Sequence, residues 1–172
     1  MDTLCRISVE EFKKCEKTPA VLVLDNVRSA LNVGSIFRTA DAFRIEKIVL
    51  CGITATPPSA EIRKTAIGAE QSVDWVHYDS NVEAVSQLKR NGYTILAIEQ
   101  ARESVMIDRM DLSGCGKVAL IFGNEVKGVD DRLMELCDLC IEIPQFGTKH
   151  SLNVSVSAGI AVWEVFKQIG NR

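Results

Sequence analysis

The feature that most constrains the fold is a set of short, almost uninterrupted apolar runs separated by segments of helical periodicity. Residues 20–27 (AVLVLDNV), 47–52 (KIVLCG) and 117–124 (KVALIFGN) carry apolar side chains at successive positions rather than at every second position. Such runs are typical of strands buried on both faces of a parallel sheet. The segments between them supply helices to cover those faces. We therefore expect an α/β fold, a parallel sheet with helices on both faces.

The remaining elements follow from periodicity and from helix-start signals. Ser8 and Glu11 have the spacing of a capping box, which predicts a short helix over residues 8–17. No linker rich in Gly, Ser or Pro divides the 172 residues, so we expect residues 1–18 as a helical extension and 19–172 as a single domain. Further strands are expected at 74–78, 94–100 and 140–145, further helices at 35–44, 57–73, 82–92, 129–138 and from Ser151, and a loop at 103–116.

Composition narrows the class of protein. A hydrophobic content of 47% and a charged content of 25% are ordinary for a globular domain, and the apolar runs are too short to span a membrane. The N-terminus has no apolar signal core, so we expect a cytoplasmic protein whose six cysteines are reduced. A formal charge of -3 argues against nonspecific nucleic-acid binding, although a local basic surface stays compatible with it.

Three polar segments follow predicted strands: residues 25–38 (DNVRSALNVGSIFR), 122–128 (FGNEVKG) and 144–153 (PQFGTKHSLN). Doubly wound sheets bind their ligands beyond the carboxyl ends of the strands, so these segments are the candidate site. The spacings of a phosphate-binding P-loop and of a dinucleotide fingerprint are both missing from the sequence, which disfavours a nucleotide triphosphate or a conventional dinucleotide.

The first segment has two interpretations. Asn32 and Gly34 predict a loop that ends where a helix starts near Ser35, and an ordinary turn would use the same two residues for positive φ. A start at Ser35 places Arg38 in the first helical turn, where its charge opposes the helix macrodipole unless an anion is bound. A phosphate held by the helix N-terminus and by Arg38 would satisfy both.

The other two segments are also open to a structural interpretation. Gly123 follows a buried strand, where a glycine allows a ligand to approach the backbone. Glu125 can accept a hydrogen bond, bind a cation or cap the next helix. Ser151 is a candidate cap for the last helix, and this leaves Asn153 in its first turn without an explanation.

The cysteine and histidine patterns indicate no metal site. Cys137 and Cys140 form a single C-x-x-C, and Cys140 continues into a predicted strand instead of opening a helix. Buried thiols are the preferred interpretation over zinc or redox chemistry. The chain has two histidines, His77 and His150, too few for a histidine-rich site.

In combination the motifs carry a family likeness. They read N-x-G-x-x-x-R at residues 32–38, FGNE-x-x-G at 122–128 and IP-x-x-G-x-x-x-SLNVSVSAG at 143–159. In order and spacing they resemble the three motifs of the SpoU/TrmH family of AdoMet-dependent RNA 2′-O-ribose methyltransferases, in the SPOUT superfamily. The resemblance extends from about Val21 to Lys167. It implies a deep C-terminal trefoil knot that holds S-adenosyl-L-methionine (AdoMet), and a homodimer whose active site lies at or near the interface.

The resemblance also implies roles for particular residues. Arg38 would clamp a phosphate of the target and orient the ribose 2′-hydroxyl, while Asn32, Glu125, Ser151 and Asn153 would shape the ribose pocket through hydrogen bonds. The residues implied for AdoMet binding are Ala97, Ile98, Glu99, Gly123, Asn124, Ile143, Gly147 and Leu152. The cations proposed for RNA contact are Arg28, Arg38, Arg63, Lys64, Lys127 and Lys149.

The implied function is 2′-O-methylation of structured RNA, with tRNA preferred over rRNA as the substrate. The alternative from another class is a catalytically silent RNA-binding or assembly protein that keeps the fold. The enzyme is favoured because a silent protein has no need of Arg38, which here occurs together with the other polar residues of the motifs, Asn32, Glu125, Ser151 and Asn153. A small-molecule enzyme on a generic doubly wound sheet is a third interpretation, disfavoured by the missing glycine fingerprint.

Overall fold

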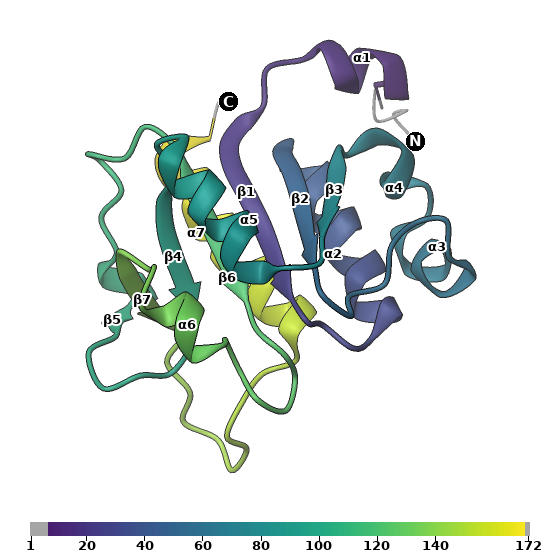
Figure 1. Cartoon of the computed structure of the whole chain (residues 1–172). Helices are drawn as coiled ribbons and strands as arrows, with labels where there is room; N and C mark the ends of the chain where they lie inside the picture. Colours follow the sequence, from purple (N-terminus) through teal and green to yellow (C-terminus); the bar gives the residue numbers. More distant parts are fainter. Residues whose placement is uncertain (1–6, 171–172) are drawn as a thin grey trace.

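Seven strands form one sheet with the order β3-β2-β1-β6-β4-β7-β5, and every pairing between them is parallel (Figure 1). The computed structural model describes residues 7–170, so the first part of the predicted extension, residues 1–6, lies outside it. The prediction of a parallel sheet is confirmed. The strands are β1 (Thr18–Asp25), β2 (Ile45–Cys51), β3 (Trp75–Tyr78), β4 (Thr94–Ile98), β5 (Val105–Met106), β6 (Val118–Phe122) and β7 (Leu139–Glu142).

Helices cover both faces of this sheet, as the apolar runs predicted. Leu22 and Leu24 of β1 point into a core shared with α2, α4 and α7, whereas Val21 and Val23 point into a second core shared with α5 and α6. None of the described helices is long and apolar enough to cross a membrane. The helices are α1 (Val9–Lys14), α2 (Ala30–Ala42), α3 (Ala60–Ala66), α4 (Ala69–Ser72), α5 (Asn81–Arg90), α6 (Asp131–Met134) and α7 (Val154–Ile169), with a 3-10 turn at Ile107–Arg109.

Several helix and loop boundaries differ from the prediction. The capping box of Ser8 and Glu11 is present at α1. The single helix predicted over residues 57–73 is divided into α3 and α4, because Ile67 and Gly68 adopt left-handed backbone conformations with φ of 53° and 93°. The loop predicted over 103–116 contains β5 and the 3-10 turn. The trefoil knot, which concerns how the chain threads through this arrangement, stays a prediction.

The start of α2 corrects the interpretation of the first motif. The helix begins at Ala30, and the side chain of its N-cap Ser29 accepts a hydrogen bond from the Asn32 backbone nitrogen at 3.3 Å. Asn32 and Gly34 are therefore helical, and the predicted loop ending near Ser35 is wrong. Arg38 is the ninth residue of α2 and lies in its third turn, beyond the reach of an unfavourable macrodipole effect.

Gly34 is explained by close packing between helices rather than by a turn. A Cβ atom at this position would lie 2.2 Å from both the Ile62 carbonyl oxygen and Thr65 Oγ1 of α3. Thr65 Oγ1 also donates a hydrogen bond to the Leu31 carbonyl of α2 at 2.8 Å. The glycine thus allows α3 to dock directly against α2, beside the motif that contains it.

Gly34→Ala is expected to destabilise the protein by about 1–3 kcal/mol, because the methyl group meets a backbone oxygen that cannot rotate away. The measurement is the free energy of unfolding from a urea titration. Gly116→Ala is the matched control, since a Cβ there meets nothing within 4 Å, and its stability is expected to change by less than about 0.5 kcal/mol. Equal stability of the two variants would contradict the packing role of Gly34.

Candidate functional site

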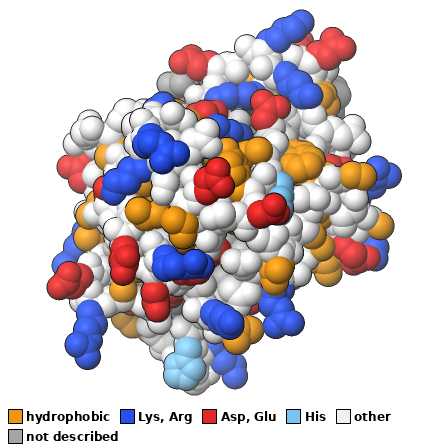
Figure 2. All heavy atoms as spheres, in the orientation of Figure 1, with side chains coloured by type: hydrophobic (Ala, Val, Ile, Leu, Met, Phe, Trp, Pro, Cys, Tyr) orange, Lys and Arg blue, Asp and Glu red, His pale blue; other side chains and the backbone are white. Residues whose placement is uncertain are grey.

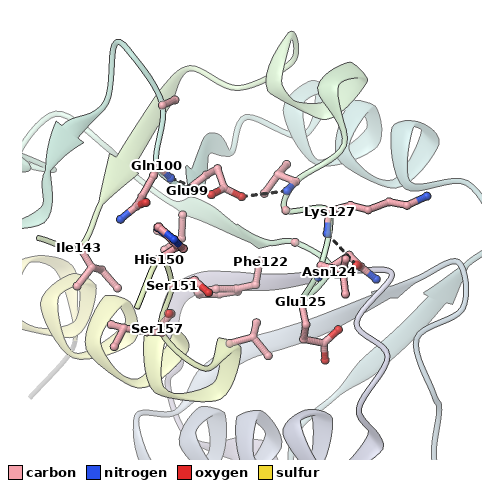
Figure 3. Close-up of a pocket in the computed structure, with 18 of the residues that line it drawn as sticks. Glu99, Gln100, Phe122, Asn124, Glu125, Lys127, Ile143, His150, Ser151 and Ser157 are labelled. Carbon is pink, nitrogen blue, oxygen red and sulfur yellow. Dashed lines mark hydrogen bonds between the residues drawn. The ribbon is translucent and has the colours of Figure 1, made fainter. Parts of the chain in front are cut away.

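A cavity of about 780 Å³ lies beyond the carboxyl ends of the central strands (Figure 3). Its walls are residues 98–101 after β4, residues 122–129 after β6, and residues 150–154 leading into α7. In Figure 3, Glu99 and Gln100 come from one wall, Asn124 and Glu125 from another, and His150 and Ser151 from the returning chain. The volume falls within the range that is usual for a cofactor or small-ligand site.

Most of the residues predicted to bind AdoMet line this cavity, and two do not. Ala97 is fully buried within β4, so its side chain does not reach the cavity. Gly147 lies on the exposed part of the loop between β7 and α7, away from the cavity lining. The residues that do line the cavity are Ile98, Glu99, Gly123, Asn124, Ile143 and Leu152.

Some lining residues lie outside the three loops that were predicted from the sequence. Asp131 and Met134 reach the cavity from α6, and Ser157 reaches it from α7. Ser157 follows Asn153 by four residues, so helical spacing from the third motif could have indicated it. No sequence pattern indicates the residues of α6, because their position depends on how that short helix docks against α5.

The Glu125 carboxylate lies at the N-terminus of α2. It accepts hydrogen bonds from the backbone nitrogens of Arg28 at 2.9 Å and Ser29 at 3.1 Å, and from Asn32 Nδ2 at 3.3 Å. This internal anion occupies the helix end at which we predicted a bound phosphate, so that phosphate site is wrong. Partial burial by itself would raise the pKa of Glu125, but these hydrogen bonds to the charged form lower it below its ordinary value.

Asn153 is the N-cap of α7, which corrects the assignment of that role to Ser151. Asn153 Oδ1 accepts hydrogen bonds from the Ser155 backbone nitrogen at 2.9 Å and from Ser155 Oγ at 2.6 Å. Its amide nitrogen donates to Asn32 Oδ1 at 3.2 Å. Asn153, which has no explanation if Ser151 is the cap, is therefore the cap itself. Its hydrogen bond to Asn32 also joins the third motif to the first. Ser151 is exposed and lines the cavity.

Hydrogen bonds also fix the loops relative to one another. The buried Asp25 carboxylate at the end of β1 accepts from Asn81 Nδ2 at 2.8 Å and from the Asp130 backbone nitrogen at 3.2 Å. Asn124 Nδ2 donates to the Asn26 carbonyl at 2.8 Å. These bonds hold the loop after β6 against the loop after β1, so the cavity wall is built before any ligand arrives.

Glu99 provides a similar link on the opposite side of the cavity. Its carboxylate accepts a hydrogen bond from the Val129 backbone nitrogen at 3.1 Å. Gly128 has φ of 72°, and a Cβ there would lie 2.4 Å from Glu99 Oε2. A glycine at this position is thus required twice, by the backbone conformation and by the approach of the carboxylate.

Arg38 lies apart from the other predicted catalytic residues. It is exposed and lines a second hollow, of about 500 Å³, between α2 and the end of α3. Arg38 follows Ser29 by nine residues, which corresponds to about 13 Å along the helix axis. Lys64 lines the same second hollow, Lys127 lines the first cavity, and Arg28, Arg63 and Lys149 are exposed.

The cysteine pair shows no sign of an activated thiol. Burial raises the pKa of Cys137 to about 11, and burial also raises the pKa of Cys140. Both thiols are consequently protonated at neutral pH, the opposite of what nucleophilic or metal-binding cysteines require. Residues 7–170 contain no group of three or more His, Cys, Asp or Glu side chains placed to hold a metal ion.

Replacing the charge at the start of α2 is expected to produce a pH-dependent loss of stability. At pH 7, Glu125→Gln should lower the free energy of unfolding by about 1 kcal/mol, since the amide lacks the charge and one acceptor oxygen. Because the pKa of Glu125 is lower in the folded than in the unfolded chain, its stabilisation is full above an ordinary glutamate pKa of 4.5 and is lost as the pH falls through the folded value.

Urea titrations at several pH values between 3 and 8 test this expectation, and the two proteins should converge at the acidic end. Glu103→Gln, a change at an exposed glutamate between β4 and β5, is the control and should alter stability by less than about 0.5 kcal/mol. A constant difference between Glu125→Gln and the unmodified protein over the whole pH range would refute the role of the charge.

Comparisons with known proteins agree with this geometry. Residues 19–163 match the SpoU rRNA Methylase family. A 23S rRNA (guanosine-2′-O-)-methyltransferase, RlmB, of Neisseria meningitidis is 32% identical over 160 residues, which cover 91% of this chain and 62% of the relative. This chain therefore spans less than two thirds of that relative's length.

Solved structures of RNA methyltransferases are also similar to this chain. An AdoMet-bound rRNA methyltransferase from Sinorhizobium meliloti superposes with a TM-score of 0.82 at 28% identity, over 93% of this chain and 61% of that one. A structure described as giving insights into the 2-OH methylation of C/U34 on tRNA has a TM-score of 0.74 at 25% identity, over 87% of this chain and 95% of that one. The parallel sheet, the second and third motif segments around one cavity and the match over residues 19–163 together show that this chain belongs to the SpoU rRNA methylase family of the SPOUT superfamily.

Proposed function

We propose that this protein transfers the methyl group of AdoMet to a ribose 2′-hydroxyl of structured RNA, and that the RNA is tRNA rather than rRNA. The observation that carries the proposal is the cavity of about 780 Å³ at which the second and third motifs meet, with the first motif joined to it through Asn32, Glu125 and Asn153. The fold is shared with a methyltransferase that binds AdoMet.

The cavity suits AdoMet in size and in lining. It combines apolar side chains such as Ile98, Phe122 and Ile143 with backbone and polar groups of three loops, the mixture expected for an amphipathic ligand. Residues 98–101 and 122–129, together with Ile143, Gln145 and residues 150–152, would hold it. When bound there, AdoMet supplies an activated methyl group, and the protein needs only to align the acceptor oxygen and help to remove its proton.

Arg38 is the residue that we assign to the RNA. A guanidinium stays protonated in proteins, so it cannot act as a free general base. It can bind a phosphate of the target with two parallel hydrogen bonds and orient the adjacent ribose hydroxyl. Ser35 and Thr39 lie beside Arg38 in the second hollow and give it a polar lining.

We further propose that the active form is a homodimer with a shared site. Within one chain the AdoMet cavity and Arg38 belong to two separate hollows, so a second copy is needed to bring an Arg38 to the cavity. The last helix offers a surface for this contact. Val156, Ile160 and Trp163 of α7 are exposed by 49%, 38% and 50%, and their spacing places them on one face of the helix.

The preference for tRNA rests on similarity and on charge. A structure described as a TrmH/SpoU tRNA modifying enzyme of A. aeolicus superposes with a TM-score of 0.82 at 28% identity, and the structure described as concerning 2-OH methylation of C/U34 on tRNA shares the same fold. On the face that carries α5 and α6, described Lys and Arg side chains are interspersed with Asp and Glu (Figure 2). The described residues accordingly form no continuous basic field on this face, of the kind that would hold a long duplex through its phosphates.

The test is methyl transfer from labelled AdoMet to total RNA of a strain that lacks this protein, followed by mapping of the labelled nucleotide. Label is expected in tRNA as a 2′-O-methyl ribose. AdoMet binding without transfer to any RNA would instead support a silent RNA-binding protein. Label in rRNA alone would overturn the tRNA assignment.

Arg38→Ala is expected to lower transfer by at least about a hundredfold, because the target loses the group that positions it. AdoMet affinity, measured by calorimetry, should stay within about twofold, since Arg38 lies outside the cofactor cavity. Arg90→Ala removes an exposed arginine of α5 that lines neither hollow and serves as the control. A parallel loss of AdoMet affinity and activity would rule out the phosphate-clamp role.

Mixing two inactive variants tests the shared site. Ala101→Trp should fill part of the AdoMet cavity, and its loss of AdoMet binding is measured first. Mixed with Arg38→Ala under conditions of subunit exchange, it should restore about a quarter of the normal activity, because half of the dimers then contain one intact composite site out of two. Zero recovery in mixed dimers, confirmed by mass spectrometry, would show that each site uses its own Arg38.

A further inference from the structure

Ile67 combines two unfavourable properties. It ends α3 with φ of 53° and ψ of 42°, the left-handed conformation that glycine and asparagine adopt readily and that a β-branched residue adopts only under strain. Its side chain is 67% exposed, so burial in the core does not offset this strain. A glycine at this position would adopt the same conformation without strain. Strained residues of this kind are concentrated at functional sites.

The surroundings of Ile67 indicate what it could contact. It lines the second hollow together with Arg38 and Lys64. Phe43 contributes a further apolar side chain, and Ser35 and Thr39 contribute hydroxyls. Cations beside an apolar surface in a shallow hollow match the chemistry of a nucleotide, whose phosphate is anionic and whose base has apolar faces.

We infer that Ile67 packs against the base of the RNA nucleotide whose phosphate Arg38 binds. This inference rests on the proposed function and deepens it, because it assigns a positioning residue for the substrate. An aliphatic side chain on the face of a base makes no hydrogen bond to the edge of that base. The contact therefore holds the nucleotide in place without reading its identity.

The docking of α3 against α2 makes this position rigid enough for such a role. Gly34 allows the two helices to touch, and the Thr65 hydroxyl joins them two residues before Ile67. The Ile67 backbone nitrogen donates to the Arg63 carbonyl at 3.1 Å, which closes the last turn of α3. Ile67 and Arg38 are thus carried by two helices that are fixed relative to each other.

Ile67→Gly removes the side chain and the strain in one change. A loss of RNA binding in this variant therefore could not be attributed to a loss of stability. Its melting temperature is expected to rise by about 2–4 °C. With tRNA isolated from a strain that lacks the protein, KM for tRNA should rise about tenfold with little change in kcat, because the contact is present in both the ground state and the transition state. AdoMet affinity should not change.

Two further variants control the result. Ile67→Val keeps a β-branched apolar side chain and should keep both the KM and the melting temperature of the unmodified protein. Ile53→Ala truncates an isoleucine that is also 67% exposed but lines neither hollow, and it should leave KM unchanged.

Three results would overturn the inference: an unchanged KM in Ile67→Gly, a lower melting temperature, or a weaker dimer in sedimentation, which would mean that a second copy of the chain covers Ile67. Binding of fluorescent tRNA, compared between Ile67→Gly and the unmodified protein, tests the contact independently of catalysis. If the unmodified protein transfers no methyl group to any RNA, the proposed function fails, and a difference in tRNA binding would still support the contact. Equal binding would refute it.

Discussion

The interaction on which the site depends is the contact of the Glu125 carboxylate with the N-terminus of α2. The carboxylate meets two backbone nitrogens of the helix start and the Asn32 amide, and Asn32 in turn meets Asn153 at the start of α7. One residue from each of the three motifs is thus present in a single chain of hydrogen bonds. The Glu125 carboxylate therefore has two effects: its charge stabilises the N-terminus of α2, and its hydrogen bonds set the geometry of the cavity rim.

Ser29 caps α2 and Glu125 accepts hydrogen bonds at the same helix end, so the start of α2 is held in place and with it the position of Arg38. A helix rises by a constant amount per residue, so Arg38 lies about 13 Å along the axis from the N-cap Ser29 and lines the second hollow instead of the cavity. The separation of the two hollows then follows from the helix itself. The composite homodimer site that we propose would account both for this separation and for the exposed apolar face of α7.

Much of the fold and of the site could be predicted from local patterns. Successive apolar residues in 20–24 and 118–122 indicate strands covered on both faces, and the structure confirms this through two separate cores. The start of α2 could not be predicted in the same way. Asn32 and Gly34 have low helix propensity, but the carboxylate of Glu125, more than 90 residues away, and the docking of α3 override that preference. The cap of α7 was misplaced by two residues for a similar reason, since Ser151 and Asn153 are both good caps and the contact with Asn32 selects the second.

The sequence by itself determined the class of fold and the identity of most cavity residues, because strand burial is set by local hydrophobicity and because the motifs follow strands whose ends meet at one edge of the sheet. Only the tertiary structure decided which polar groups face each other: Glu125 with the start of α2, Asn153 with Asn32, and Asp25 with Asn81. It alone placed Arg38 and Ile67 in a hollow apart from the AdoMet cavity. These pairings join residues far apart in the chain, and their geometry depends on how helices dock on the sheet, which local spacing does not encode.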